Sequence, residues 1–129
     1  TLAPPNVDVK RWPDGIGGCD FIVFACALNE TTRHIFNGEI LASLKPGVRI
    51  VNISRGGLID EAALVSGVEN GVIAGAALDV FEAEPLPERS RLRKYSNLVF
   101  GSHNGSNTID AVVRTSEKAI SILEKFLNG

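Results

Sequence analysis

Four short apolar runs, separated by longer segments with helical spacing, constrain the fold of this chain more than any other feature of its sequence. The runs are DFIVFACA at 20–27, GVRIVNIS at 47–54, IAGAALDVF at 73–81 and NLVFGS at 97–102. Each run is continuously apolar, which is typical of strands that are covered on both faces. Strands that alternate with helices in this way form a parallel sheet with flanking helices. The sequence therefore predicts an α/β domain with about four parallel strands.

Three further segments have the apolar spacing of helices. Residues 31–47 place apolar side chains on one helical face, with Asn37 as a candidate cap. Residues 59–71 begin with acidic side chains, which favour a helix N-terminus, and end at an Asn-Gly pair. Residues 107–128 form a long amphipathic pattern that we expect to close the domain, and residues 7–12 are a candidate edge strand.

Composition excludes several classes of protein. The 129 residues carry a formal net charge of -2, which gives no electrostatic reason to bind nucleic acid. The longest apolar stretch, at 21–28, is too short to cross a bilayer, and the first residues lack the pattern of a signal peptide. Cys19 and Cys26 suit a reduced protein and suggest neither a disulfide nor a metal site. We therefore expect a cytoplasmic protein without nucleic-acid, membrane or metal partners.

Ionisable side chains follow the predicted strands where these end. In a parallel sheet the carboxyl ends of the strands line one edge, and ligands bind in the crevice outside it. The side chains expected there are Arg55, Asp79, Glu84 and His103. A guanidinium can bind a carboxylate at two points, and a histidine backed by a carboxylate can exchange a proton near neutral pH. This set suits a small acid that has an oxygen function next to its carboxylate.

Each of these residues also has an ordinary structural explanation. Arg55 can form an ion pair with Asp60 or Glu61 across the glycine turn. Asp79 can cap the next turn. Loop or turn positions without a function would equally explain His34, Glu84 and His103. Only the joint order of the residues favours a functional site.

Three ordered segments resemble the D-isomer-specific 2-hydroxyacid dehydrogenases, a family that includes phosphoglycerate, glycerate, formate and D-lactate dehydrogenases. They are LKPGVRIVNISRGGLIDEAAL, IAGAALDVFEAEPLP and NLVFGSHNGSNT, and the upstream segment CDFIVFACALNETTRHIFNGEILASLKPG is also similar. The resemblance covers residues 19–129 and implies the C-terminal half of a Rossmann-like, doubly wound NAD-binding domain. It implies that the Gly-rich first half and the substrate domain are absent, and it leaves residues 1–18 of uncertain origin.

The resemblance also implies roles for individual residues. Arg55 would hold the substrate carboxylate, His103 would act as the acid/base, and Glu84 would pair with this histidine. The cofactor, NAD or NADP, would lie along Cys26, Ala27, Ile53, Ser54, Asp79, Asn104 and Gly105. The implied reaction is hydride transfer between this cofactor and a small D-2-hydroxy or 2-oxo acid.

Two departures from the family pattern raise an alternative. Ser102 stands where the family usually has proline, and GIGG at 15–18 precedes a predicted strand, so it is no substitute for the Gly-x-Gly-x-x-Gly turn that opens a helix. The alternative is a non-catalytic remnant or interaction module that keeps the fold. In either case the edge of the first strand would be open, so we expect a homodimer or a larger homo-oligomer. The resemblance implies a dimer as well.

Overall fold

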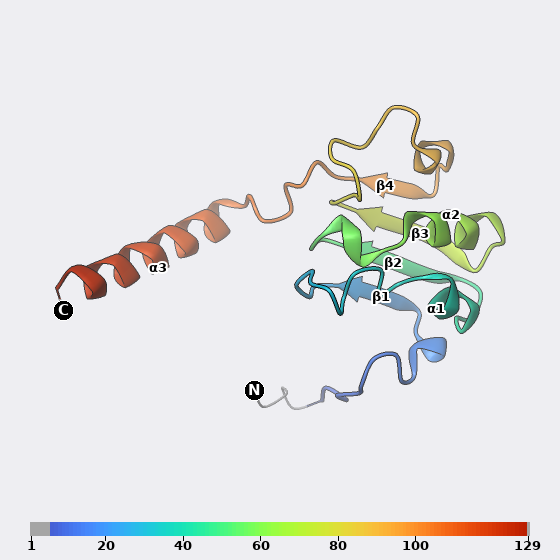
Figure 1. The fold of residues 1–129 in the computed structure, drawn as a ribbon, viewed down its shortest axis with the longest axis horizontal. Helices are drawn as coiled ribbons and strands as arrows, with labels where there is room; N and C mark the ends of the chain where they lie inside the picture. The colour runs from blue at the N-terminus through green and yellow to red at the C-terminus, as the bar shows by residue number, and fades with distance from the viewer. Residues whose placement is uncertain (1–5, 129) are drawn as a thin grey trace.

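A four-stranded parallel sheet organises the computed structural model, which describes residues 6–128. The strands lie side by side in chain order (Figure 1) and are β1 (Phe21–Phe24), β2 (Val48–Asn52), β3 (Ile73–Leu78) and β4 (Leu98–Phe100). All three neighbouring pairs are parallel, so the four carboxyl ends meet at one edge of the sheet. The predicted parallel, Rossmann-like portion is confirmed, and each strand is shorter than its apolar run.

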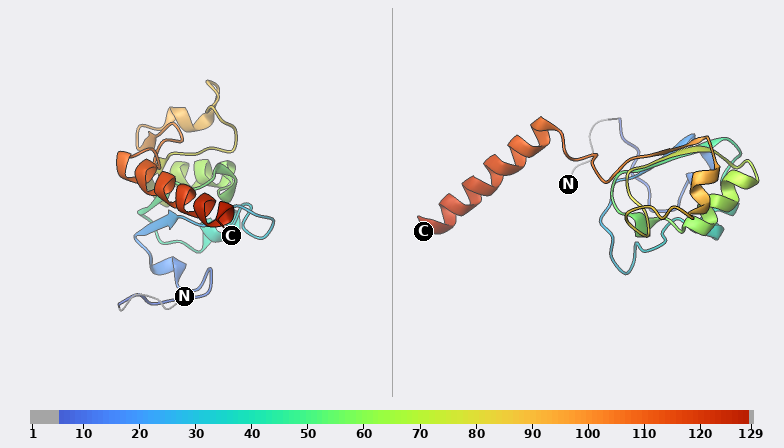
Figure 2. Two further views of the ribbon diagram at one scale, coloured as in Figure 1. Left: turned by 90° about the vertical axis from the view of Figure 1, so that its left-hand side faces the viewer. Right: turned by 90° about the horizontal axis from the view of Figure 1, so that it is seen from above.

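Two short helices cover one face of the sheet (Figure 2). They are α1 (Gly38–Ala42) and α2 (Glu61–Glu69), and they are accompanied by the 3-10 turns η1 (Ile16–Gly18), η2 (Gly56–Leu58) and η3 (Arg91–Lys94). The Asn37 side chain accepts hydrogen bonds from the first amides of α1, and the Asp60 side chain does the same for α2. Each helix therefore begins at a capping side chain, as the sequence predicts for Asn37.

The segment before α1 differs from the prediction. Residues 31–35 form turns, and Phe36 pairs with Ile59 in an isolated parallel bridge. This pairing requires extended backbone at Phe36, so the helix begins only after Asn37. The apolar spacing of 31–47 is nevertheless real, because Phe36 is fully buried and Leu41 and Leu44 also belong to the core.

Nothing within residues 6–128 covers the opposite face of the sheet, and the expectation of strands covered on both faces is wrong. Burial alternates along β1 and β2, and Phe21, Val23 and Val99 are 58%, 57% and 67% exposed. The cause is topological. Each new strand is added on the same side of the previous one, so right-handed crossovers place both connecting helices on one face.

The last helix, α3 (Ile109–Leu127), leaves the sheet and does not close the domain (Figure 1). It begins at the capping side chain of Thr108, as an isolated helix can, but none of its residues is buried. Its apolar stripe, which includes Ile109 and Phe126, is exposed because no element among residues 6–128 packs against it. Residues 7–11 form no regular structure, so the candidate edge strand is also wrong.

Among the described residues, no helix has the length and apolar character needed to cross a membrane.

Paired substitutions of phenylalanine test this division between a packed sheet and an unpacked helix. Phe36 is fully buried and contacts Phe24 edge to face at a centroid distance of 6.1 Å. We expect Phe36→Ala to lower the free energy of unfolding by about 3–5 kcal/mol. The control Phe126→Ala, at an 80% exposed position of α3, should change it by no more than about 0.5 kcal/mol. Urea unfolding measures both, and an equal loss for the two variants would show that α3 packs against the core.

Candidate active site

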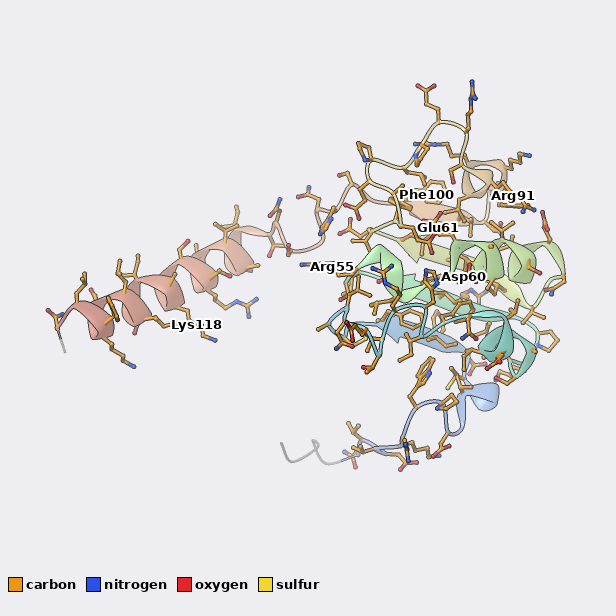
Figure 3. All side chains as sticks on the ribbon, in the orientation of Figure 1. Arg55, Asp60, Glu61, Arg91, Phe100 and Lys118 are labelled. Carbon is orange, nitrogen blue, oxygen red and sulfur yellow. The ribbon has the colours of Figure 1, made fainter. Side chains whose placement is uncertain are left out.

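The turn after β2 directs Arg55 away from the sheet. Asn52 is buried, and its side chain accepts a hydrogen bond from the Ser54 amide at 3.1 Å and donates one to the Arg55 carbonyl at 2.9 Å. Gly56 follows, and a Cβ atom there would lie 1.9 Å from the carbonyl group of Phe81. Only glycine fits this contact, which brings the turn after β2 close to the segment after β3. The Arg55 side chain, just before this glycine, is exposed at the carboxyl edge of the sheet (Figure 3).

The ion pair considered for Arg55 does not form. Its guanidinium donates to the neighbouring Ser54 carbonyl at 2.7 Å, and it has no ion pair with any residue in the described range 6–128. Asp60 instead caps α2, and the Glu61 carboxylate accepts a hydrogen bond from the Glu82 amide at 2.8 Å. The guanidinium is therefore available to an anionic ligand.

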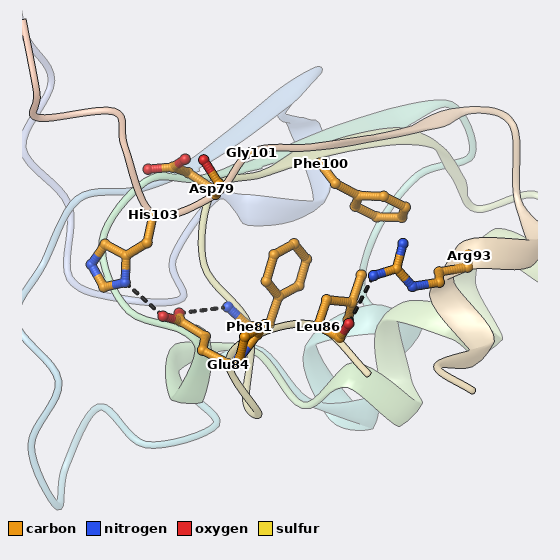
Figure 4. A pocket seen from close by; sticks show the side chains of 10 residues that line it. Asp79, Phe81, Glu84, Leu86, Arg93, Phe100, Gly101 and His103 are labelled. Carbon is orange, nitrogen blue, oxygen red and sulfur yellow. Dashed lines mark hydrogen bonds and ion pairs between the residues drawn. The ribbon is translucent and has the colours of Figure 1, made fainter. Parts of the chain in front are cut away.

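His103 and Glu84 form a direct hydrogen-bonded pair (Figure 4). The Nδ1 atom of His103 lies 2.7 Å from Oε2 of Glu84, and the other carboxylate oxygen accepts the Phe81 amide at 3.1 Å. The hydrogen bond from His103 lowers the pKa of Glu84, the Phe81 amide adds to this effect, and the positive charge of Arg55 lowers the pKa further. The carboxylate therefore stays ionised and orients the imidazole ring through Nδ1.

Asp79 lies at the end of β3 and reaches the loop that carries His103. Its carboxylate accepts the amides of Asn104 at 3.0 Å and Gly105 at 2.7 Å. These two hydrogen bonds are the main causes that lower the pKa of Asp79. Asp79 therefore does cap a turn, as its structural explanation proposed. The capped turn follows β4, however, and is not the next turn along the chain.

A second histidine–carboxylate pair lies nearby and is not evident from the sequence. His34 Nε2 lies 2.7 Å from Oε1 of Glu82. Burial raises the pKa of Glu61, which is hydrogen-bonded to the Glu82 amide. The bridge between Phe36 and Ile59 brings the His34 loop to this position. The sequence contains no local signal for that long-range pairing. Glu82 is therefore evident as the partner of His34 only in the structure.

The two histidine–carboxylate pairs and two arginines line one hollow of about 540 Å³ at the carboxyl edge of the sheet. The lining residues with ionisable side chains are Arg33, His34, Arg55, Glu82, Glu84 and His103. Each carboxylate already contacts a histidine, whereas neither arginine has a carboxylate partner among the described residues. The hollow therefore combines unneutralised guanidinium groups with a titratable histidine, an arrangement that can bind an anionic molecule and exchange a proton with it.

The residues expected along the cofactor fall into two groups. Cys26, Ala27 and Ser54 line a hollow of about 430 Å³ at the ends of β1 and β2, and the Ser54 hydroxyl donates to the Cys26 carbonyl. Ile53 is 57% exposed beside them. The second group, Asn104 and Gly105, is bound to Asp79.

The donor set fits only one part of a dinucleotide. The hollow at the ends of β1 and β2 combines small side chains with the larger side chains of Leu28 and Arg55, a surface that suits a flat ring and a ribose. A diphosphate needs successive amides at a helix N-terminus. Residues 15–18 do not supply them, because η1 is followed by the strand β1 and not by an α-helix.

The opposite side of the Glu84–His103 pair is apolar. A hollow of about 550 Å³ there is walled by Leu86 and by Phe81 and Phe100, whose rings meet edge to face at 5.7 Å (Figure 4). Its one arginine, Arg93, donates to the Leu86 and Pro87 carbonyls at 2.7 and 3.0 Å. The Glu84–His103 pair thus lies between an apolar hollow and a second hollow, whose arginines have no carboxylate partner in the part of the chain that the structure describes.

Comparison with known proteins places this chain in a family. Residues 4–105 match the family described as D-isomer specific 2-hydroxyacid dehydrogenase, NAD binding domain. The chain is 48% identical over 110 residues to D-3-phosphoglycerate dehydrogenase of Synechocystis sp., which covers 85% of this chain and 20% of that protein. It is 38% identical over 125 residues to glyoxylate reductase of Thermofilum pendens, which covers 97% of this chain and 37% of that protein.

A solved structure agrees. The D-isomer specific 2-hydroxyacid dehydrogenase from Xanthobacter autotrophicus Py2, in complex with NADPH and MES, superposes with a TM-score of 0.66 at 41% identity and covers 68% of this chain and 28% of that chain. The chain belongs to the D-isomer specific 2-hydroxyacid dehydrogenase family and corresponds to a portion of its NAD-binding domain. It spans between 20% and 37% of the length of the two curated relatives named above.

The Glu84–His103 contact predicts a specific change in acid titration. In His103→Ala the pKa of Glu84 should rise toward the ordinary value of a glutamate, because its main stabilising hydrogen bond is lost. The lowered pKa means that the pair stabilises the fold above the ordinary glutamate pKa and that this contribution disappears as the pH falls through the folded-state pKa. Carboxyl carbon NMR measures the titration. The matched control is His34→Ala, which removes the partner of Glu82 and should leave Glu84 unchanged; an unshifted Glu84 in His103→Ala would contradict the assignment.

Proposed function

We propose that this segment supplies the proton-transfer and carboxylate-binding half of the active site of an NAD-dependent or NADP-dependent D-2-hydroxyacid dehydrogenase. The observation that carries the proposal is the unpaired guanidinium of Arg55, which faces the same hollow as the Glu84–His103 pair. When bound, the nicotinamide cofactor supplies the hydride acceptor or donor. The relatives described as D-3-phosphoglycerate dehydrogenase and glyoxylate reductase support a substrate of the 2-hydroxy or 2-oxo acid class.

Each of the three side chains has a distinct task in this proposal. Arg55 binds the substrate carboxylate through two parallel N–H donors and so fixes the adjacent carbon in front of His103. His103 removes the hydroxyl proton during oxidation and returns it during reduction of the oxo acid. Glu84 accepts the Nδ1 hydrogen bond, which keeps Nε2 directed toward the substrate and stabilises the ring when it is charged.

The assignments along the cofactor are part of the same proposal. Cys26, Ala27, Ile53 and Ser54 would lie along the dinucleotide at the ends of β1 and β2. Asp79, Asn104 and Gly105 would lie near the nicotinamide. The relative crystallised with NADPH supports either nicotinamide dinucleotide as the cofactor. A cytoplasmic location remains a prediction.

A non-catalytic binding module is the second candidate function. Its support is Ser102, which stands where the family usually has proline and leaves the loop that carries His103 less constrained. Against it stands the chemistry of the site, because an unpaired arginine and an exposed histidine–carboxylate pair contribute little to folding. The combination of Arg55, Glu84 and His103 therefore favours the enzyme.

Replacement of Arg55 tests the proposed substrate contact. In a full-length polypeptide that contains this segment, Arg55→Ala should lower kcat/KM by about 10- to 150-fold, since a hydrogen bond to a charged group contributes about 1.5–3 kcal/mol. Arg55→Lys should recover only part of this loss, because an ammonium group cannot make the two-point contact. The control is Arg89→Ala in an exposed loop. A kcat/KM that is unchanged by Arg55→Ala would contradict the carboxylate-binding role.

Homo-oligomer formation through β1 is a further part of the proposal. β1 is an edge strand of the sheet, and its side chains Phe21 and Val23 are exposed on the bare face. Open edges and apolar patches favour association. We expect a dimer or larger species in sedimentation analysis of the chain. Val23→Lys should weaken it, because a lysine on an edge strand opposes pairing, whereas the control Val9→Lys, in an irregular segment, should not. A wild-type monomer at high concentration would contradict this proposal.

A further inference from the structure

We infer that Asp79 is a positioning residue, which holds the His103 loop in the conformation that lets this histidine contact Glu84. The inference rests on the proposed role of His103 and adds a second task to Asp79, beyond the contact with the nicotinamide that the resemblance implies.

One residue binds three successive amides of the loop. The carbonyl oxygen of Asp79 accepts the His103 amide at 2.8 Å. Its carboxylate oxygens accept the next two amides, Oδ1 that of Asn104 at 3.0 Å and Oδ2 that of Gly105 at 2.7 Å. Hydrogen bonds to an ionised acceptor are stronger than those between neutral groups. The end of β3 thus fixes the path of the backbone just after β4.

The backbone of His103 needs such support. Its φ angle is 58°, in the left-handed region that residues other than glycine rarely adopt. Conformations of this kind persist where the surrounding structure over-determines them. The preceding residue is Ser102, which does not restrict its own φ as a proline would. The hydrogen bonds that the loop amides donate to Asp79 are therefore the main described constraint on this turn.

The loop is shaped around the Asp79 carboxylate. A Cβ atom at Gly101 would lie 2.2 Å from Oδ1, and one at Gly105 would lie 3.0 Å from Oδ2. Both glycines leave the space that the carboxylate occupies. β3 and β4 are joined at the same point by the Gly101 amide, which donates to the Leu78 carbonyl at 2.8 Å. The carboxylate is thus seated between the strand end and the loop.

This arrangement connects Asp79 to the acid/base residue without direct contact between their side chains. The His103 ring meets Glu84 at 2.7 Å, and this distance depends on where the loop places the ring. Each carboxylate oxygen of Asp79 retains a further lone pair, so the loop contacts leave room for a hydrogen bond from a cofactor amide. The Asp79 carboxylate would then position both His103 and the nicotinamide.

The test uses the Glu84–His103 contact as its readout in the 129-residue chain. Asp79→Asn has nearly the same shape, but its nitrogen cannot accept an amide hydrogen bond and its charge is lost. We expect the loop to loosen and the pKa of Glu84 to rise toward its ordinary value, the same direction that we predict for His103→Ala. Carboxyl carbon NMR follows this titration, and the amide spectrum of β2 reports whether the sheet remains folded. The control Asp14→Asn, in an exposed turn, should leave Glu84 unchanged.

A second variant covers the case in which Asp79→Asn does not fold. Gly105→Ala keeps the aspartate but places a methyl group 3.0 Å from Oδ2, so the Asp79 carboxylate and the amide of residue 105 must separate by a few tenths of an ångström. It should raise the pKa of Glu84 in the same direction. A folded Asp79→Asn or Gly105→Ala variant with an unshifted Glu84 overturns the inference. Neither readout depends on catalysis, so failure of the proposed enzyme activity would appear separately, in the kinetics of the Arg55 variants.

Discussion

The parallel pairing of β2, β3 and β4 is the constraint on which the rest of the structure depends. Because the three strands run in the same direction, segments that are distant in sequence emerge at one edge of the sheet. Arg55 follows β2, Asp79 follows β3 and His103 follows β4. An antiparallel partner would send one of them to the opposite edge. The parallel direction of the strands therefore determines which side chains meet at the site.

Strand direction alone does not define the geometry, and short-range contacts complete it. A buried asparagine, Asn52, shapes the turn that exposes Arg55, and the close contact of Gly56 with Phe81 joins this turn to the segment that leads to Glu84. Asp79 anchors the third loop. These contacts are made by backbone amides and carbonyls that the strands leave unpaired where they end. The same hydrogen bonds that satisfy these backbone groups also position the functional side chains.

The sequence is sufficient to predict the four strands, the cap Asn37, and the edge at which Arg55, Glu84 and His103 gather. These features depend on local periodicity and on the direction of parallel strands. The sequence is insufficient where an outcome depends on pairing between distant segments. The bridge between Phe36 and Ile59 removed the first half of a predicted helix and gave His34 its partner. An amphipathic pattern predicted α3 correctly as a helix, but such a pattern does not specify what covers its apolar face.

The central claim is that Arg55 and His103 form a binding site for a small 2-oxo acid. NMR of the 129-residue chain, with arginine and histidine side chains labelled, tests it most directly when NADH and glyoxylate are added together. We predict that the Arg55 guanidinium and the His103 ring both shift, and that the shift of the His103 ring is lost in Arg55→Ala. Arg93 should not shift, because its guanidinium is bound to two carbonyls. A folded chain in which neither Arg55 nor His103 shifts, or an Arg55→Ala variant in which the His103 ring shifts as it does in the wild type, would contradict the claim.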